Sequence, residues 1–447
     1  MVTYEERDEP TGTRAPRCTI DTSASWTSRG ELAGPLSAAT QGLFMWLSAL
    51  RAPVVLALVS ALALAACSNS SGTPEVGRSA GSGSTSPTSD LTDDSIQAVL
   101  DRALPRGGSG TMIAARGGKV THCAGYGMAD RALRIAASCD TVYDIMSMTK
   151  SFTAVAIMKL QMAGKLRVSD TISKFVGPVT ADKRNITIHQ LLTHTSGLPE
   201  ALGDDYDPIS RQQMIDGAAK SRLIAPPGTK FAYSNLGYSL LAAVIENASG
   251  MDYEHFLAEQ IFAPAGMKHT GYVLPRWETE RIAVEYDEQG VSQRRPLDHG
   301  WAADGPYWNL RGNGGLLSTA RDMYRFHRAL TSDILLDRDA QAMMFKAHAP
   351  TGLPGYDGYA TGYGWIIMPD GSLATHSGGN DWSYGVNMHA VHGELMVFWI
   401  SNQAAQNGKW DLQEIARPLM LKLIKQLQAG SSLGCGQRGV RMACGPW

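Results

Sequence analysis

The chain has 447 residues and a formal net charge of −2 at pH 7, with 44% hydrophobic and 18% charged residues. This length can bury a large core, and the composition is that of a soluble globular protein. The sequence holds no basic stripe with interleaved aromatic residues, no His-Glu-x-x-His, no paired Cys-x-x-Cys and no phosphate-binding glycine loop. We therefore expect no nucleic-acid partner, no metal and no cofactor.

The N-terminal region has the pattern of an export signal. Residues 52–66 are almost wholly apolar, a run too short to span a bilayer comfortably but typical of a signal-peptide core. It ends in Leu-Ala-Ala-Cys, which resembles the lipoprotein box of bacteria, so we expect Cys67 to be lipidated and to begin the mature chain. A plain secretory signal and an uncleaved anchor are the alternatives. Residues 1–66 are thus interpreted as leader and signal peptide, with residues 1–44 an extension and translation starting at Met45.

Composition also divides the rest of the chain. Residues 67–90 are rich in Ser, Gly, Thr and Pro and predict a flexible linker. Residues 91–428 carry the patterned elements of one folded domain, and the Gly-rich residues 429–447 are expected to be a disordered tail. A signal, a lipidated cysteine and a linker together predict an exported protein of the bacterial cell envelope, held at the membrane by its lipid anchor. We expect it to be a monomer.

Six cysteines are compatible with export. Cys123 and Cys139 flank a predicted hairpin, where they could pair in an oxidising compartment or remain two buried free thiols. Cys435 and Cys444 could pair locally in the tail. Pairing cannot be derived from sequence alone.

Hydrophobic periodicity predicts strands near both ends of the domain and helices between them. The expected elements, in chain order, are a helix over 93–104, strands over 110–115 and 119–126, a helix opened by Ser147, a helical and turn-rich region over 169–330, strands over 361–368, 373–376, 383–390 and 394–401, and a helix over 411–427. This order predicts an α+β fold in which one sheet is assembled from both chain ends and an all-helical region is inserted.

Ser147 and Lys150 form a Ser-x-x-Lys motif at the start of a predicted helix. Residues at i and i+3 share a helix face, so the amine can lie beside the serine oxygen. A serine becomes a nucleophile when a nearby base takes its proton, and a lysine can be that base if burial lowers its pKa. Alone, the motif is equally compatible with a helix that Ser147 caps.

Two later motifs favour the catalytic interpretation. Tyr233-Ser234-Asn235 precedes a helical pattern, and His376-Ser377-Gly378-Gly379 follows a turn. Taken singly, Tyr233 could be a core aromatic and Asn235 a helix cap. In this chain order the three motifs are the pattern of penicillin-recognising serine hydrolases.

On these residues, over about Leu91 to Gln428, the chain resembles class C β-lactamases, secreted D-alanyl-D-alanine carboxypeptidases and serine esterases of the same fold. The phrases Leu191 to Leu198 and Gly314 to Thr319 add to the resemblance. It implies a β-lactamase/transpeptidase-like α/β sandwich, with an antiparallel sheet flanked by helices and the site at the boundary with the helical region.

The resemblance also implies roles for the site residues. Ser147 is the expected nucleophile, Lys150 the group that accepts its proton, and Tyr233 a second proton-transfer group kept as a phenolate between the cations Lys150 and His376. Asn235 would bind the substrate and help to fix Lys150.

The resemblance also implies which residues at the edge of the sheet bind the substrate. His376, Ser377 and Gly378 would contact substrate, and the backbone amides of Ser147 and Gly379 would form the oxyanion hole.

His376 departs from the family pattern, because class C β-lactamases carry lysine at this position. A histidine titrates near pH 6.5, so we predict that binding of carboxylate-bearing substrates weakens as pH rises through about 6 to 7. The departure favours ester or peptide hydrolysis over β-lactam turnover. His194 is interpreted as part of a hydrogen-bonded turn.

Several aromatic residues could line a pocket beside the serine, although aromatics more often pack in a core. They are Trp301, Tyr307, Trp308, Trp382 and Tyr384.

The sequence therefore predicts a serine hydrolase that acts through an acyl-enzyme on an ester, an amide or a D-Ala peptide. Its expected substrate is a small molecule or short peptide. Two alternatives remain open: a β-lactamase that hydrolyses β-lactam antibiotics, and a penicillin-binding sensor or scaffold that is acylated but not turned over quickly.

Overall fold

A computed structural model of the chain describes residues 93–432. The leader, Cys67, the linker and the chain end from 433 lie outside the described residues, so export, lipidation and the pairing of Cys435 with Cys444 stay predictions. Between residues 93 and 432, no helix combines the length and apolar character needed to cross a membrane.

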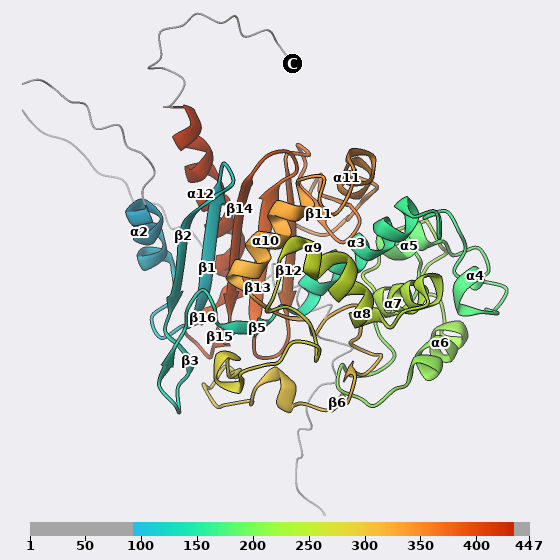
Figure 1. Ribbon diagram of the computed structural model, residues 1–447, viewed down its shortest axis with the longest axis horizontal. Coiled ribbons are helices and arrows are strands. Elements are labelled where there is room, and N and C mark those ends of the chain that lie inside the picture. The colour runs from blue at the N-terminus through green and yellow to red at the C-terminus, as the bar shows by residue number, and fades with distance from the viewer. Residues whose placement is uncertain (1–92, 433–447) are drawn as a thin grey trace, which may run out of the picture. The chain divides into compact units, whose positions relative to one another are not determined.

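The described part is built around an antiparallel sheet (Figure 1) in which the first two strands of the domain lie beside its last strands. Its strand order is β2-β1-β14-β13-β12-β11-β10-β9. The pairing of Gly110 with Ser401 and of Arg116 with Leu395 joins the first strand to the last long one. The strands are β1 (Gly110–Arg116), β2 (Lys119–Tyr126), β9 (Ala349–Pro350), β10 (Ala360–Thr361), β11 (Ile366–Ile367), β12 (Leu373–Gly379), β13 (Tyr384–Ala390) and β14 (Leu395–Ser401). This confirms the α+β fold expected from the sequence.

One face of the sheet is covered by the first and last helices, α2 (Asp93–Ala103) and α12 (Leu412–Ser432) (Figure 1). Ile96 and Leu100 of α2 join Leu419 and Leu423 of α12 in a core cluster with the sheet. α12 continues to Ser432, five residues beyond the end of the helix expected over 411–427.

The other face packs against α3 (Thr149–Met162), α10 (Ala320–Leu330) and the inserted helical region (Figure 1). Residues 149–158 of α3 are all buried, as are the ten residues after Asn235 in α7, so both helices are surrounded by protein rather than lying on a surface. The inserted helices are α4 (Ser173–Val176), α5 (Ile188–Leu192), α6 (Arg211–Lys220), α7 (Asn235–Ser249), α8 (Tyr253–Leu257) and α9 (Ala263–Ala265), with α11 (Arg338–Phe345) following α10.

Short strands connect the layers. β5 (Val142–Asp144) pairs with β8 (Leu317–Thr319) and leads directly to Ser147. The remaining strands are β3 (Met128–Asp130), β4 (Ile135–Ala136), β6 (Trp301–Ala302), β7 (Gly305–Pro306), β15 (Ala405–Gln406) and β16 (Trp410–Asp411).

The continuous strand expected over 361–368 is wrong. The segment folds back as the hairpin of β10 and β11, with Gly364 at φ +72° between them. A Cβ atom on Gly364 would lie 2.8 Å from the carbonyl oxygen of Lys150. The chain therefore turns at Gly364, because a residue without a side chain is needed where the hairpin packs closely against α3 beside Lys150.

Cys123 and Cys139 form a disulfide, which excludes the alternative of two free thiols. The bond ties β2 to the segment that enters β5, so it braces the approach to Ser147.

Candidate active site

Ser147 lies in a single turn of 3₁₀ helix, Met146–Met148, between β5 and α3. The preceding residue Met146 has φ +49°, a left-handed conformation that costs a non-glycine residue about 1 kcal/mol. Its N–H donates to Asp144 Oδ1 at 2.6 Å, which holds this sharp turn. The turn leaves Ser147 only partly buried while its neighbours are fully covered.

Lys150 is completely buried at the first turn of α3. Its Nζ donates to Ser147 Oγ at 3.0 Å and to the backbone carbonyl of Asn313 at 2.7 Å. Burial lowers the pKa of Lys150 to about 7, an effect that the carboxylates of Asp205 and Glu200 partly oppose. A substantial fraction of this amine is therefore neutral near pH 7 and able to accept a proton from the serine.

Tyr233 brings a phenol to the same point from a segment more than eighty residues away. Its hydroxyl is hydrogen-bonded to the Ser147 side chain, and Lys150 Nζ lies 5.0 Å from the ring centroid. Burial raises the pKa of Tyr233, and the hydrogen bond to Ser147 offsets only part of that rise. Oxygen, amine and phenol thus meet, but the phenol stays protonated, so the predicted phenolate is wrong.

His376 is buried on β12 beside these groups, and its Nδ1 lies 2.6 Å from the carbonyl oxygen of Ser377. Burial, with a smaller contribution from the charge of Lys150, lowers the pKa of His376 to about 3. The imidazole is neutral throughout the physiological range, so the predicted titration between pH 6 and 7 is wrong. The sequence identifies a histidine at this position, but its charge depends on how deeply the fold buries the ring.

Gly378 packs directly against the turn that carries the serine. A Cβ atom there would lie 2.9 Å from the backbone nitrogen of Ser147 and 2.8 Å from the carbonyl oxygen of Ile145. β11 pairs only with Ala374 and Thr375 of β12. Within the described residues, the outer edge of β12 from His376 to Gly379 thus has no neighbouring strand, which leaves backbone groups available to a ligand.

The sequence profile of the family named Beta-lactamase matches residues 101–417. The chain belongs to the β-lactamase family. Members of this family are serine hydrolases, and the three motifs that carry Ser147, Tyr233 and His376 lie inside the matched range.

Curated relatives of this β-lactamase-family protein include two from Bacillus subtilis (strain 168). Penicillin-binding protein 4* is 30% identical over 61% of this chain and 63% of its own length. The putative penicillin-binding protein PbpX is 29% identical over 70% of this chain and 75% of its own length. The chain thus spans about three fifths of the length of penicillin-binding protein 4*. Among solved structures, the octameric penicillin-binding protein homologue from Pyrococcus abyssi superposes with a TM-score of 0.61 at 26% identity, over 74% of this chain and 76% of that one.

Asn235 does not fix Lys150 in this family member. Its side chain makes no hydrogen bond to the amine, and its buried Oδ1 has no hydrogen-bond partner among the described residues. The carbonyl of Asn313 binds Lys150 instead, and the Asn313 amide donates to Ser239 Oγ at 2.9 Å. Nor does Asn235 cap α7, since the preceding Ser234 accepts from the N–H of Gly237. This unpaired acceptor is compatible with the expected contact of Asn235 to substrate.

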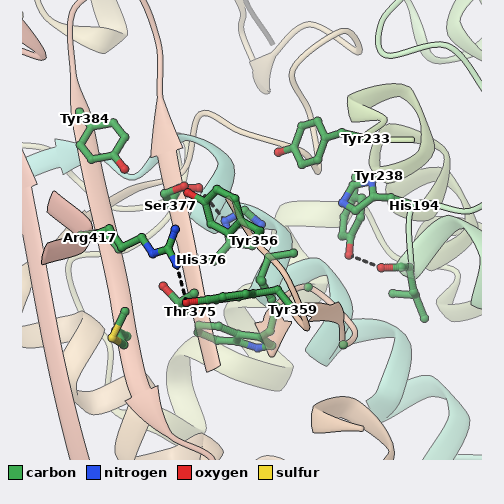
Figure 2. A pocket seen from close by; sticks show the side chains of 17 residues that line it. His194, Tyr233, Tyr238, Tyr356, Tyr359, Thr375, His376, Ser377, Tyr384 and Arg417 are labelled. Atoms are coloured by element: carbon green, nitrogen blue, oxygen red, sulfur yellow. Dashed lines mark hydrogen bonds between the residues drawn. The ribbon is translucent and has the colours of Figure 1, made fainter. Parts of the chain in front are cut away.

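His194 was interpreted as structural and lies directly against Tyr233. The two rings stack with centroids 4.5 Å apart, and His194 Nδ1 accepts the backbone N–H of Ser234 at 3.1 Å. His194 has φ +54°, a conformation that is rare outside glycine. The turn carrying this histidine thus positions the phenol (Figure 2).

Two carboxylates near Lys150 were not foreseen. Burial raises the pKa of Glu200 to about 7 and of Asp205 to about 6, although the charge of Lys150 opposes both shifts. Neither residue belongs to a recognisable motif, because they come from the irregular loop after α5. Their charges set how far burial can depress the pKa of Lys150.

Of the aromatic residues expected near the serine, Tyr384 alone lines the cavity beside Tyr233 and His376 (Figure 2). Trp382 stacks on His299 with centroids 4.6 Å apart, and Trp308 lies 5.2 Å from the guanidinium of Arg311. Between residues 93 and 432, no three His, Cys, Asp or Glu side chains are grouped so that they could hold a metal ion.

Proposed function

We propose that this protein is a serine hydrolase that cleaves an ester or amide through an acyl-enzyme on Ser147. The observation that carries the proposal is the contact of Ser147 Oγ with a fully buried amine whose pKa lies near 7. A buried lysine with no catalytic duty would be a costly feature, since desolvating its charge is unfavourable.

In the proposed reaction, neutral Lys150 takes the proton of Ser147 while Oγ attacks the carbonyl carbon. The negative charge on the carbonyl oxygen is stabilised by the backbone amides of Ser147 and Gly379, as the family pattern implies. Tyr233, a protonated phenol in contact with Ser147, gives its proton to the departing alcohol or amine and recovers one from Lys150. Water then hydrolyses the acyl-enzyme.

The neutral state of His376 supports an uncharged ester or amide over a carboxylate-bearing substrate, because no fixed positive charge stands at that position. A second candidate, reaction with penicillin-like β-lactams, is supported by the relatives called penicillin-binding proteins. Both candidates share the same nucleophile and differ in the rate at which the acyl-enzyme is hydrolysed.

The test is to locate and follow the acyl group. After incubation with a fluorophosphonate, peptide mass spectrometry is expected to find the adduct on Ser147, and Ser147→Ala should not be labelled. Equal labelling of the wild type and of Ser147→Ala would contradict the proposal that Ser147 is the nucleophile. Aryl acetates, D-Ala-D-Ala peptides and a chromogenic cephalosporin then rank the substrates. Acylation by cephalosporin that persists for hours without product would favour the penicillin-binding sensor.

The pH dependence of the labelling rate should follow the protonation state of Lys150. We expect the rate with a neutral phosphonate to rise as pH increases through about 7 and then to level off, because only the neutral amine accepts the serine proton. His376 should add no step between pH 5 and 8. A stopped-flow profile that is flat from pH 6 to 8 would contradict the assignment of Lys150 as the base.

A further inference from the structure

A cavity that is open to solvent lies next to the proposed catalytic groups (Figure 2). Tyr233, His376 and Ser377 form part of its wall, whereas Ser147 does not line it. The cavity then extends along β12 and β13 to α12 and to the loop that precedes β10. It is therefore continuous with the phenol side of the site.

The wall of this cavity is aromatic and apolar. Its lining includes Tyr356 and Tyr359 of the loop, Val386 and Met388 of β13, and the rings of Trp365 and Tyr384. No carboxylate lines it, and its two histidines, His194 and His376, have pKa values lowered by burial. Such a lining binds apolar surface far better than charge.

Arg417 is the single fixed charge in this wall, and its hydrogen bonds already serve the fold. Its guanidinium donates to the carbonyl oxygen of Gly355 at 2.9 Å and to the hydroxyl of Tyr359 at 3.0 Å. The same group lies 4.5 Å from the ring centroid of Tyr356. Arg417 thus holds the tyrosine-bearing loop against α12 (Figure 2).

The position of Tyr233 indicates which part of the substrate, the acyl group or the leaving group, would enter the cavity. In the proposed reaction Tyr233 protonates the departing atom, so the leaving group must lie on the phenol side of the scissile bond. That side is the one on which the cavity opens. We propose that the cavity is a leaving-group subsite that selects esters or amides whose departing alcohol or amine carries an aryl or long alkyl group. This inference rests on the proposed function and narrows its substrate class.

The experiment compares acetate esters of alcohols with similar acidity: ethanol, 1-octanol and 2-phenylethanol. All give the same acetyl-enzyme, so differences in kcat/KM report acylation and the leaving group alone. We expect the octyl and phenylethyl esters to exceed the ethyl ester by about 10-fold or more. The acetate of 4-(2-hydroxyethyl)benzoate is included as a charged analogue of the phenylethyl ester.

Two variants place the preference in the cavity. Val386→Phe fills it from β13 and should reduce the phenylethyl preference to about threefold or less while kcat/KM for ethyl acetate stays unchanged. Tyr356→Ala removes another part of the wall, from a largely exposed loop, so it tests the same idea without disturbing the core. The rate of Ser147 labelling verifies that each variant is folded.

The outcomes separate the subsite from the proposed function. If Ser147 is labelled and ethyl acetate is hydrolysed, but no preference exists or neither variant lowers it, the subsite is wrong and the hydrolase stands. If no ester is hydrolysed and Ser147 is not labelled, the proposed function itself fails. A faster reaction of the benzoate analogue that is lost in Arg417→Met would overturn the apolar subsite in favour of an anion site.

Discussion

Lys150→Met is expected to lower kcat/KM by about 10³-fold or more and, at the same time, to stabilise the fold. The loss follows because Ser147 would have no base within reach, since its Oγ contacts the Lys150 amine at 3.0 Å. Hydrolysis of an uncharged aryl acetate is the measurement. Lys159→Met is the matched control on the same helix, because Lys159 Nζ binds the carbonyl of Leu335 away from the serine and should be dispensable for activity.

The gain in stability follows from the same pKa. In the unfolded chain this lysine stays protonated up to about pH 10.5, whereas burial in the fold lowers its pKa to about 7. Keeping it in the fold therefore costs on the order of 4 kcal/mol at and below neutral pH, and the cost disappears as pH rises toward 10.5. Methionine removes that cost but leaves the carbonyl of Asn313 without its donor, and this unsatisfied acceptor destabilises the fold by about 1 to 3 kcal/mol.

We thus expect a net gain on the order of 2 kcal/mol in the free energy of unfolding at pH 7, measured by urea titration. The advantage of Lys150→Met over wild type should shrink between pH 7 and pH 10. A variant that is less stable at pH 7, or an advantage that does not change with pH, would contradict a buried amine of lowered pKa.

Gly378→Ala is expected to reduce kcat/KM by about 100-fold, because a displacement of about 1 Å at the nucleophile has effects of that size. The added methyl group would meet backbone atoms of Ile145 and Ser147 at less than 3 Å, so either β12 or the serine turn must move. Rates of Ser147 labelling and ester hydrolysis should fall together.

The control for this substitution is Gly300→Ala. Its Cβ would have only ordinary contacts, the nearest being 3.5 Å from the carbonyl oxygen of Tyr206, so activity should change by less than about twofold. If Gly378→Ala labels at the wild-type rate, close packing of β12 on the serine turn does not position the nucleophile.

Local sequence was a good guide to the regular elements of this chain and a poor one to its electrostatics. β1, β2, β13 and β14 lie within one or two residues of their predicted bounds because they are short, largely apolar runs set off by turn residues such as Gly117 and Gly118. The segment 361–368 was misassigned because its glycines permit a turn whose need comes from α3, a distant part of the fold.

The candidate site shows the same division. The motifs named Ser147, Lys150 and Tyr233, which the fold does bring together. The charge of His376 could not be read from its neighbours in sequence, because it depends on burial by other elements. The carbonyl of Asn313 that holds Lys150 was also missed, since any residue type could supply it.

The pairing of β1 with β14 has a consequence for biosynthesis. Gly110 and Ser401 are neighbours in the sheet although almost three hundred residues separate them in the chain, so the loop between them must close before the sheet exists. A ribosome that has translated as far as residue 370 has already made Ser147, Lys150 and Tyr233, but not β12, against which the serine turn packs. The candidate site can therefore form only after β12 has been synthesised and has paired with the rest of the sheet.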